Sequence, residues 1–163
     1  MACLLSTWLL AALSLAPPAA GGVTYDTYIV PAGTALTLEV QTTASSTTSR
    51  EGEQVTAKLL HAIVRGEVEL VPAGSKVFGT IVERQGASGP KPGRLGVRFH
   101  VVQHLVTGSR AAIRTELVAA EGGQVRARKF GVPVMRGTEA AIQAGSIVSC
   151  NLEEPLRVMI PKR

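Results

Sequence analysis

Hydrophobic and polar residues alternate along most of the chain with the period of two that is typical of half-buried β-strands. The clearest case is residues 95–101, where Leu95, Val97, Phe99 and Val101 alternate with polar or small residues. No apolar pattern has a helical period over a useful length; only residues 138–142 allow a short helix. The pattern predicts strands at residues 23–30, 36–40, 55–59, 68–70, 76–84, 95–101, 111–117, 125–130, 147–152 and 156–160, the last two as a closing pair.

A repeated turn sequence separates several of these strands. Val-Pro-Ala-Gly-Thr occurs at 30–34, Val-Pro-Ala-Gly-Ser at 71–75, and a looser copy, Gln-Ala-Gly-Ser, at 143–146. Proline restricts φ, and glycine adopts the positive φ that other residues avoid, so each copy predicts a tight turn that starts a strand. The structural turn residues are Pro31, Gly33, Pro72, Gly74 and Gly145.

Short strands with turn signals every 8–12 residues predict an all-β fold, a single small β-barrel of about nine or ten strands. Residues 76–84 have apolar residues on both faces, which favours a central strand, and Gly79 marks a bend or a close backbone approach within it. The polar stretches at 42–53 and 85–93 predict exposed loops.

The first residues have a different character. Residues 4–16 are almost entirely apolar and are followed by Pro-Pro-Ala-Ala-Gly-Gly at 17–22. This arrangement is typical of a secretory signal peptide, and the run is shorter than the roughly 20 residues that a membrane-spanning helix needs. We therefore expect a signal peptide at 1–22, a β-barrel domain at 23–163 without a transmembrane segment, and export to the periplasm or the outer membrane.

The amino-acid composition of the chain indicates which class of partner to expect. The chain has 163 residues, 45% of them hydrophobic, which is enough for one domain with its own core. The net charge is +5, and for an exported protein this favours envelope proteins or an anionic envelope surface over nucleic acid as partners. Cys150 is the only cysteine after the leader, so we expect no internal disulfide and a buried, unreactive thiol.

Residues for acid–base or metal chemistry are few. His100 and His104 lie on or just after a strand, where four residues span about 13 Å, too far for one metal ion without a sharp bend. No nucleophile-elbow, phosphate-loop or dinucleotide motif occurs. We therefore expect no enzyme, no cofactor and no metal. Cell-wall cleavage is the alternative, and it would depend on Asp26 with His61 or His100.

Basic residues are concentrated in the second half of the chain. Regular strands would place Arg94 and Arg98 on one face, and Arg126 and Arg128 on another, with Lys129 beside them. Such side chains either form a solvated face that prevents edge-to-edge aggregation or bind an anionic surface or partner. The candidate anion-binding or partner-binding residues are Arg94, Arg98, Arg126, Arg128 and Lys129.

Residues 28–118 resemble the C-terminal barrel of the TrbI-like family, the envelope-spanning scaffold proteins of conjugative and type IV secretion machines. The resemblance rests on the order of Pro31–Thr34, the Gly52-x-x-Val55-x-Ala57 strand, Val71–Ser75, the Gly79–Ile81 step and the Leu95–Phe99 strand. It implies a β-barrel that acts as a scaffold or interaction module in the bacterial envelope.

The chain also departs from that family. A signal peptide stands where the family has a cytoplasmic tail, a transmembrane helix and a proline-rich spanner. The region at about 121–144 is too short and too charged for the family's apolar helical insertion into the outer membrane. A small exported relative that keeps only the barrel fits better. Carriage of a small apolar ligand inside the barrel remains a further alternative, and the oligomeric state is open.

Overall fold

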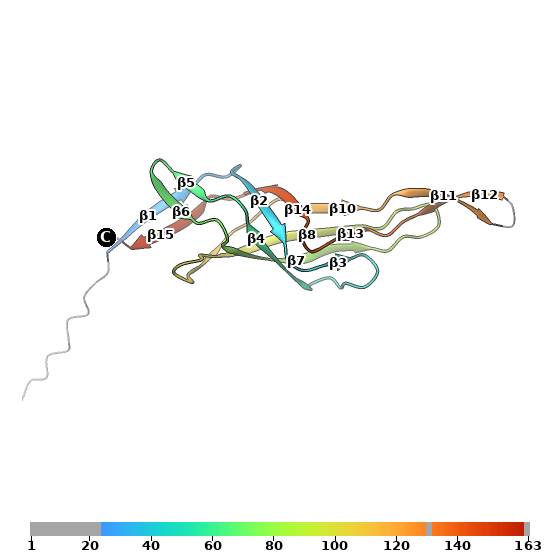
Figure 1. Ribbon diagram of the computed structural model, residues 1–163, viewed down its shortest axis with the longest axis horizontal. Coiled ribbons are helices and arrows are strands. Elements are labelled where there is room, and N and C mark those ends of the chain that lie inside the picture. Colours follow the sequence, from blue (N-terminus) through green and yellow to red (C-terminus); the bar gives the residue numbers. More distant parts are fainter. Residues whose placement is uncertain (1–23, 130–131, 162–163) are drawn as a thin grey trace, which may run out of the picture.

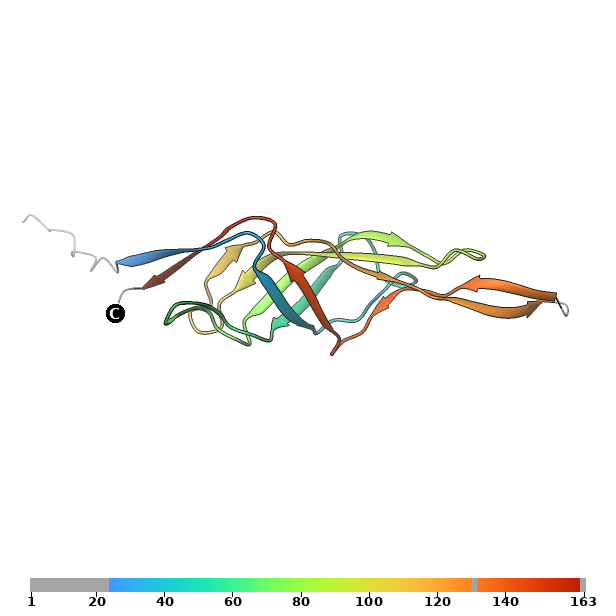
Figure 2. The same ribbon diagram turned by 90° about the horizontal axis from the view of Figure 1, so that it is seen from above.

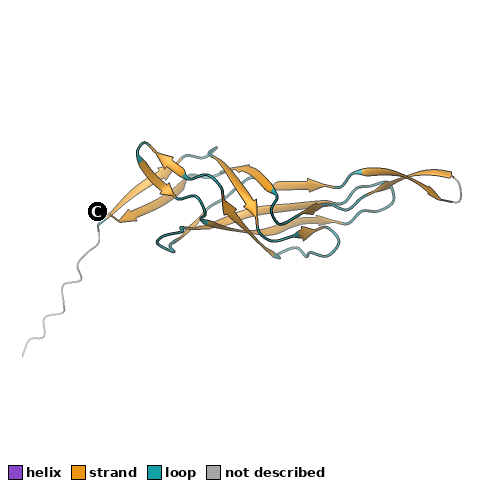
Figure 3. Cartoon of the chain, viewed as in Figure 1, coloured by secondary structure: helices purple, strands orange, loops and turns teal. Residues whose placement is uncertain are grey.

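A computed structural model describes residues 24–129 and 132–161. Within them every regular element is a strand and none is a helix, as Figure 3 shows. The strands are β1 (Tyr25–Val30), β2 (Ala35–Val40), β3 (Ala44–Ser45), β4 (Gln54–Leu59), β5 (Ile63–Arg65), β6 (Val68–Val71), β7 (Lys76–Gln85), β8 (Arg94–Gln103), β9 (Arg110–Ala112), β10 (Val118–Glu121), β11 (Gln124–Lys129), β12 (Val132–Gly137), β13 (Ala141–Ile142), β14 (Ile147–Asn151) and β15 (Leu156–Pro161).

The largest sheet has seven strands. Six follow the order β10–β8–β7–β4–β2–β14, and β9 pairs with β8 at Val101–Gln103, beyond the part that β10 covers. All of these pairs are antiparallel. The sheet curls as a half-barrel, and its pairing does not close into a ring (Figure 2). The all-β prediction is therefore confirmed. The strand order does not show the closed barrel that the sequence predicted.

Four pairs of strands lie outside this sheet: β1–β15, β3–β13, β5–β6 and β11–β12. The β1–β15 pair lies at one end of the elongated molecule, and the β11–β12 hairpin projects from the other end (Figure 1). The two closing strands were expected to pair with each other, and that expectation is wrong. Instead β14 pairs with β2, and β15 pairs with β1.

The longest strands of the sheet form the β7–β8 hairpin, with ten residues in each strand. The central position predicted for 76–84 is confirmed, because β7 has β4 on one side and β8 on the other. The two apolar faces of this strand differ in burial: Val77 and Ile81 are buried, but Val82 is 45% exposed. The ladder shifts register at Phe78/Gly79, so the predicted bend is present. A Cβ at Gly79 would lie 2.7 Å from Phe99 Cδ1 and 2.8 Å from the carbonyl oxygen of Arg98, which explains the glycine.

One cluster of buried side chains forms the core. Its largest members are Phe99, Leu38, Leu59, Leu70 and Ile81, and each exposes less than 2% of its surface. They come from β8, β2, β4 and β7 of the main sheet and from β6 of a separate pair, so the alternation in the sequence does identify the side of these strands that faces the core.

The region around residue 140 differs from the expectation. Residues 138–142 do not form a helix; Ala141 and Ile142 make the short strand β13, which pairs with Ser45 and Ala44 of β3. The preceding Glu139 bonds to groups from two distant loops, and these tertiary contacts outweigh a weak local helix preference. The strand expected at 111–117 is also shorter than predicted, since β9 ends at Ala112.

Candidate functional site

The three related turn sequences make the same contacts. Gly33, Gly74 and Gly145 have φ values of 83°, 87° and 87°. In each turn the glycine N–H donates to a carbonyl oxygen of a neighbouring segment, that of Leu152, Leu59 and Val40 respectively, at 2.7 Å. In return, the N–H groups of the same three residues donate to the carbonyl oxygens of Thr34, Ser75 and Ser146 respectively, at 2.9–3.0 Å. Each turn therefore both starts one strand and holds the end of its neighbour.

The hydroxyls in these turns add a further bond. Thr34 Oγ1 donates to the carbonyl oxygen of Pro31, and Ser75 Oγ donates to that of Pro72, both at 2.7 Å. Ser75 is completely buried and also accepts a hydrogen bond from the N–H of Leu105. The turn residues thus bring backbone groups together and present no reactive side chain.

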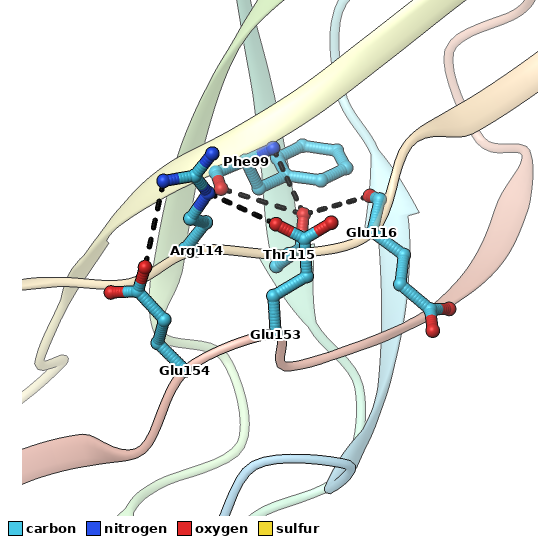
Figure 4. A network of polar contacts seen from close by, with 6 residues as sticks. All are labelled: Phe99, Arg114, Thr115, Glu116, Glu153 and Glu154. Atoms are coloured by element: carbon cyan, nitrogen blue, oxygen red, sulfur yellow. Dashed lines mark hydrogen bonds and ion pairs between the residues drawn. The ribbon is translucent and has the colours of Figure 1, made fainter.

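A buried threonine joins the sheet to the segment before β10 (Figure 4). Thr115 has no exposed surface; its Oγ1 accepts a hydrogen bond from the Phe99 N–H at 3.1 Å and can donate to the Glu116 carbonyl oxygen, also at 3.1 Å. Next to it, Arg114 reaches Glu153 at 3.0 Å and Glu154 at 3.5 Å across the surface. The only sign of this network in the sequence is that Thr115 stands in a series of alternate positions whose other members, such as Ile113 and Leu117, are apolar.

The same region contains the cysteine. Cys150 is buried, as expected, and burial raises the pKa of its thiol to about 11. The hydrogen bond with Thr115 opposes this rise in pKa, and the charge of Glu116 adds to it. Because the thiolate is the reactive form, a thiol in this setting is inert at neutral pH.

A second polar network connects three loops. Ser46 Oγ donates to Glu139 Oε2 at 2.5 Å, and the N–H of Ala87 donates to both carboxylate oxygens of Glu139 at 3.1 Å. Arg84 Nε donates to the carbonyl oxygen of Ser46 at 2.7 Å. The hydrogen bond from Ser46 is the largest cause of a lowered pKa at Glu139, followed by the one from Ala87. Ser46 is fully buried, and its hydroxyl also accepts a hydrogen bond from the N–H of Ala140 at 3.0 Å, so it ties the Glu139 segment to the loop after β3.

The residues considered for wall cleavage lie on separate elements. Asp26 is in β1, His61 is exposed in the turn after β4, and His100 is exposed on β8. His104 belongs to the turn after β8, where its Nδ1 accepts hydrogen bonds from the N–H groups of Val106 and Thr107 at 3.2 Å. Within the described residues there is no group of three or more possible metal ligands. Asp26, His61 and His100 therefore come from three separate parts of the fold.

The five candidate basic residues fall into two groups. Arg94 and Arg98 lie on β8; Arg94 forms an exposed ion pair with Glu121 at 2.9 Å, and the Nε of Arg98 is buried without a hydrogen-bond partner in the described part of the chain. Arg126, Arg128 and Lys129 lie on β11, in the projecting hairpin, and Arg126 is exposed. Arg126 and Arg128 are two positions apart on this strand.

Two cavities open on the surface near the β1–β15 pair. The first, of about 610 Å³, lies between β1 and β5 and is lined mainly by apolar side chains that include Ile29, Ile63 and Val64. Arg65 crosses it and donates from Nη1 to the carbonyl oxygen of Ile29 at 2.7 Å. The second, of about 450 Å³, lies between β9 and β15 and includes Arg110 and Arg157 among its lining residues. These two arginines are far apart in the sequence, and only the fold brings them to one cavity.

Membrane-spanning helices are also absent from the described ranges, 24–129 and 132–161: none of their segments forms an apolar helix of the necessary length.

No protein-family profile and no curated protein sequence matches the chain. Among solved structures it is similar to ComB10 of the Com type IV secretion system of Helicobacter pylori. The TM-score is 0.53, and the match covers 83% of this chain and 93% of the ComB10 chain at 16% sequence identity. ComB10 is a protein of the VirB10/TrbI family. The TrbI-like resemblance noted in the sequence is therefore confirmed as a likeness of fold.

Proposed function

We propose that this chain is a non-enzymatic, exported module of the cell envelope that acts as a scaffold through contacts with other envelope components. The observation that supports this most is the likeness of fold to ComB10, a component of a type IV secretion system, over most of both chains. Fold alone does not determine function, so the proposal also depends on which surfaces are available for contacts.

The β11–β12 hairpin is the surface best suited to such contacts. Residues 124–137 contain four basic residues and no acidic one. The hairpin projects beyond the half-barrel sheet (Figure 2), and Val125 and Met135 on it are 48% and 44% exposed. A basic strand pair with exposed apolar side chains is complementary to an acidic protein surface or to an anionic envelope surface. We place the main partner contact here, with Arg126, Arg128 and Lys129 as its cationic residues and Arg94 and Arg98 as a secondary group.

A pull-down from envelope extract tests this assignment. The double variant Arg126→Glu with Arg128→Glu reverses two charges on the hairpin. Its matched control is Lys58→Glu with Lys76→Glu, which reverses two exposed charges that face each other on adjacent strands of the main sheet. We expect the hairpin variant to lose the partners that wild type and control retain. Equal retention by all three proteins would contradict the role of the hairpin.

Export is a separate part of the proposal. We propose that residues 1–22 are a signal peptide and that residues 23–163 form the mature protein, located in the periplasm or at the outer membrane. N-terminal sequencing of the protein from an envelope fraction should find a new terminus between Gly21 and Val23. An intact Met1 on protein recovered from the cytoplasm would contradict this part alone.

The 610 Å³ cavity supports a second candidate function, carriage of a small apolar ligand. Its lining is mostly apolar, and its volume falls in the range of small-molecule sites, about 300–1,000 Å³. Native mass spectrometry of the purified protein distinguishes the two functions. A bound mass that is lost when Ile63→Arg fills the cavity would favour carriage, whereas bare protein in every preparation would argue against it.

A further inference from the structure

The seam between β9 and β15 has unpaired strand edges on both sides. In the described residues β9 pairs only with β8, and β15 pairs only with β1. Each strand therefore has a second edge whose backbone N–H and C=O groups belong to no ladder. Such an edge can accept an added strand from a partner, a recurring mode of peptide recognition.

The cavity of about 450 Å³ at this seam has an apolar floor. Val71, Val102 and Val158 contribute to its lining, and each exposes 7% or less of its surface. Ala111 of β9 and Met159 of β15 lie on its two sides. An extended segment placed here would bury its inward side chains against valine and alanine, which favours apolar residues at every second position.

Charge determines what the outward side chains of such a segment would be. Arg110 pairs in register with Gln103 and lies over the Phe78 ring, with its Cζ 5.7 Å from the ring centroid, so it faces the outer side of the sheet. Arg157 pairs with the exposed Ile29 and alternates with the buried Val158, so it also faces outward. No carboxylate residue lines the cavity, and within the described residues no ion pair neutralises either arginine.

We propose that this seam binds an extended acidic segment of a partner protein, in which apolar and acidic residues alternate. The segment pairs with the free edge of β15, its apolar side chains cover the valine floor, and its carboxylates bind Arg157 and draw the Arg110 guanidinium away from the Phe78 ring, where it lies in the unbound protein. This inference rests on the proposed function as a contact module and identifies a partner chemistry for a surface distinct from the hairpin.

The test uses purified protein and defined peptides. The probe is a fluorescently labelled, acetylated and amidated octapeptide of alternating Val and Glu, and binding is followed by fluorescence anisotropy at low salt. We expect saturable binding, and we expect the double variant Arg110→Gln with Arg157→Gln to raise the Kd about tenfold or more, because charge-assisted hydrogen bonds to carboxylate are among the stronger polar contacts. Arg50→Gln, an exposed arginine in the loop before β4, is the matched control and should leave the Kd unchanged.

Two further peptides test the edge pairing and the charge. The same peptide with N-methyl groups on alternate residues keeps its charge but loses the backbone donors of one edge, so it should bind at least about tenfold more weakly. Equal binding of the N-methylated peptide, or of a Val–Lys peptide, would overturn the proposal. Decanoate serves as a competitor of the labelled peptide. If decanoate displaces the peptide from wild type, and if its own affinity also falls in the Arg110→Gln with Arg157→Gln variant, the seam is a site for amphiphilic anions and the proposal is overturned.

The hairpin variant separates this proposal from the broader one. Arg126→Glu with Arg128→Glu should bind the Val–Glu peptide like wild type, because the hairpin lies at the opposite end of the molecule from β15 (Figure 1). If no peptide binds but envelope partners still depend on the hairpin, the seam proposal fails and the contact-module function stands.

Discussion

The half-barrel sheet and the β11–β12 hairpin are both built from antiparallel strands, but different forces stabilise them. Strands of the sheet bury one face in a shared core, so that Leu38, Phe99 and Val97 expose 1% or less of their surface. The hairpin has one partner per strand, and Val125 and Met135 remain about half exposed. A two-stranded ribbon has no core of its own and is marginally stable alone. The sheet therefore provides the stability, whereas the hairpin provides exposed surface, on which we propose the partner contact.

Truncation of a side chain in each region should show the largest contrast. Phe99→Ala removes the largest fully buried side chain and should lower the free energy of unfolding by about 3–5 kcal/mol. Val125→Ala on the hairpin should change it by less than about 0.5 kcal/mol, as is usual for exposed positions. Urea unfolding followed by circular dichroism measures both. Similar losses for the two variants would mean that the hairpin belongs to the same cooperative core.

Loss of the Thr115 hydroxyl should have the next largest effect. Thr115→Val keeps the shape of the side chain but removes the acceptor for the Phe99 N–H. A buried donor without a partner costs about 1–3 kcal/mol, and urea unfolding should show a loss of that size. Thr27→Val, at an exposed position of β1, is the control and should be near neutral. A neutral Thr115→Val would show that water or another group replaces the hydroxyl.

The turns should have a smaller and more uniform effect. Nothing lies within 4 Å of a Cβ added at Gly33 or Gly145, so alanine there tests only the cost of positive φ. Each substitution should lower the midpoint of thermal unfolding, by an amount that corresponds to about 1–2 kcal/mol. Gly86→Ala serves as the control, because its backbone does not have positive φ and its added Cβ has 4.0 Å of space. An unchanged midpoint for Gly33→Ala would show that the turn relaxes to another conformation.

The Glu139 network should give the smallest effect, visible only in acid. Its pKa in the folded state is lowered from the ordinary value of 4.5, chiefly by the Ser46 hydrogen bond. Because the pKa of Glu139 is lower in the folded than in the unfolded state, the ionised carboxylate contributes to the free energy of unfolding at pH values above the unfolded-state pKa. This contribution is lost as the pH falls through the folded-state pKa. We therefore expect wild type to lose more stability than Glu139→Gln as pH falls below 4.5, and thermal unfolding across that range measures the difference. Parallel pH profiles for the two proteins would contradict the assignment.

Local patterns in the sequence predicted local structure well. Alternation located β2, β4, β6 and β8 to within a few residues, and β2 and β4 do bury every second side chain. The segments expected from apolar or β-branched runs between turn signals correspond to β1, β7, β14 and β15. The Pro-Ala-Gly sequences identified the turns, because only glycine tolerates the required φ. Gly79 was predicted to mark a bend or a close backbone approach, and the structure has both a register shift and a close approach of Phe99 and Arg98 at this glycine.

Pairing between distant strands was not predictable in the same way. The bond between Ser46 and Glu139 joins residues 93 positions apart, and β13 forms where β3 provides a partner. The pairs β14–β2 and β15–β1 are likewise chosen by burial of the shared core, not by the turn between β14 and β15. The seam with Arg110 and Arg157 depends on this long-range pairing, which is why the sequence gives no local signal for it.

Photo-crosslinking in cells tests the central claim, that the projecting hairpin makes contacts while the sheet supports it. A photoreactive amino acid replaces Met135 on the hairpin in one variant and Val82 on the outer face of β7 in another, two positions that are 44% and 45% exposed. We predict crosslinks to an envelope partner from position 135 and none of comparable yield from position 82. Crosslinks from position 82 alone would contradict the account, because they would place the contact surface on the sheet.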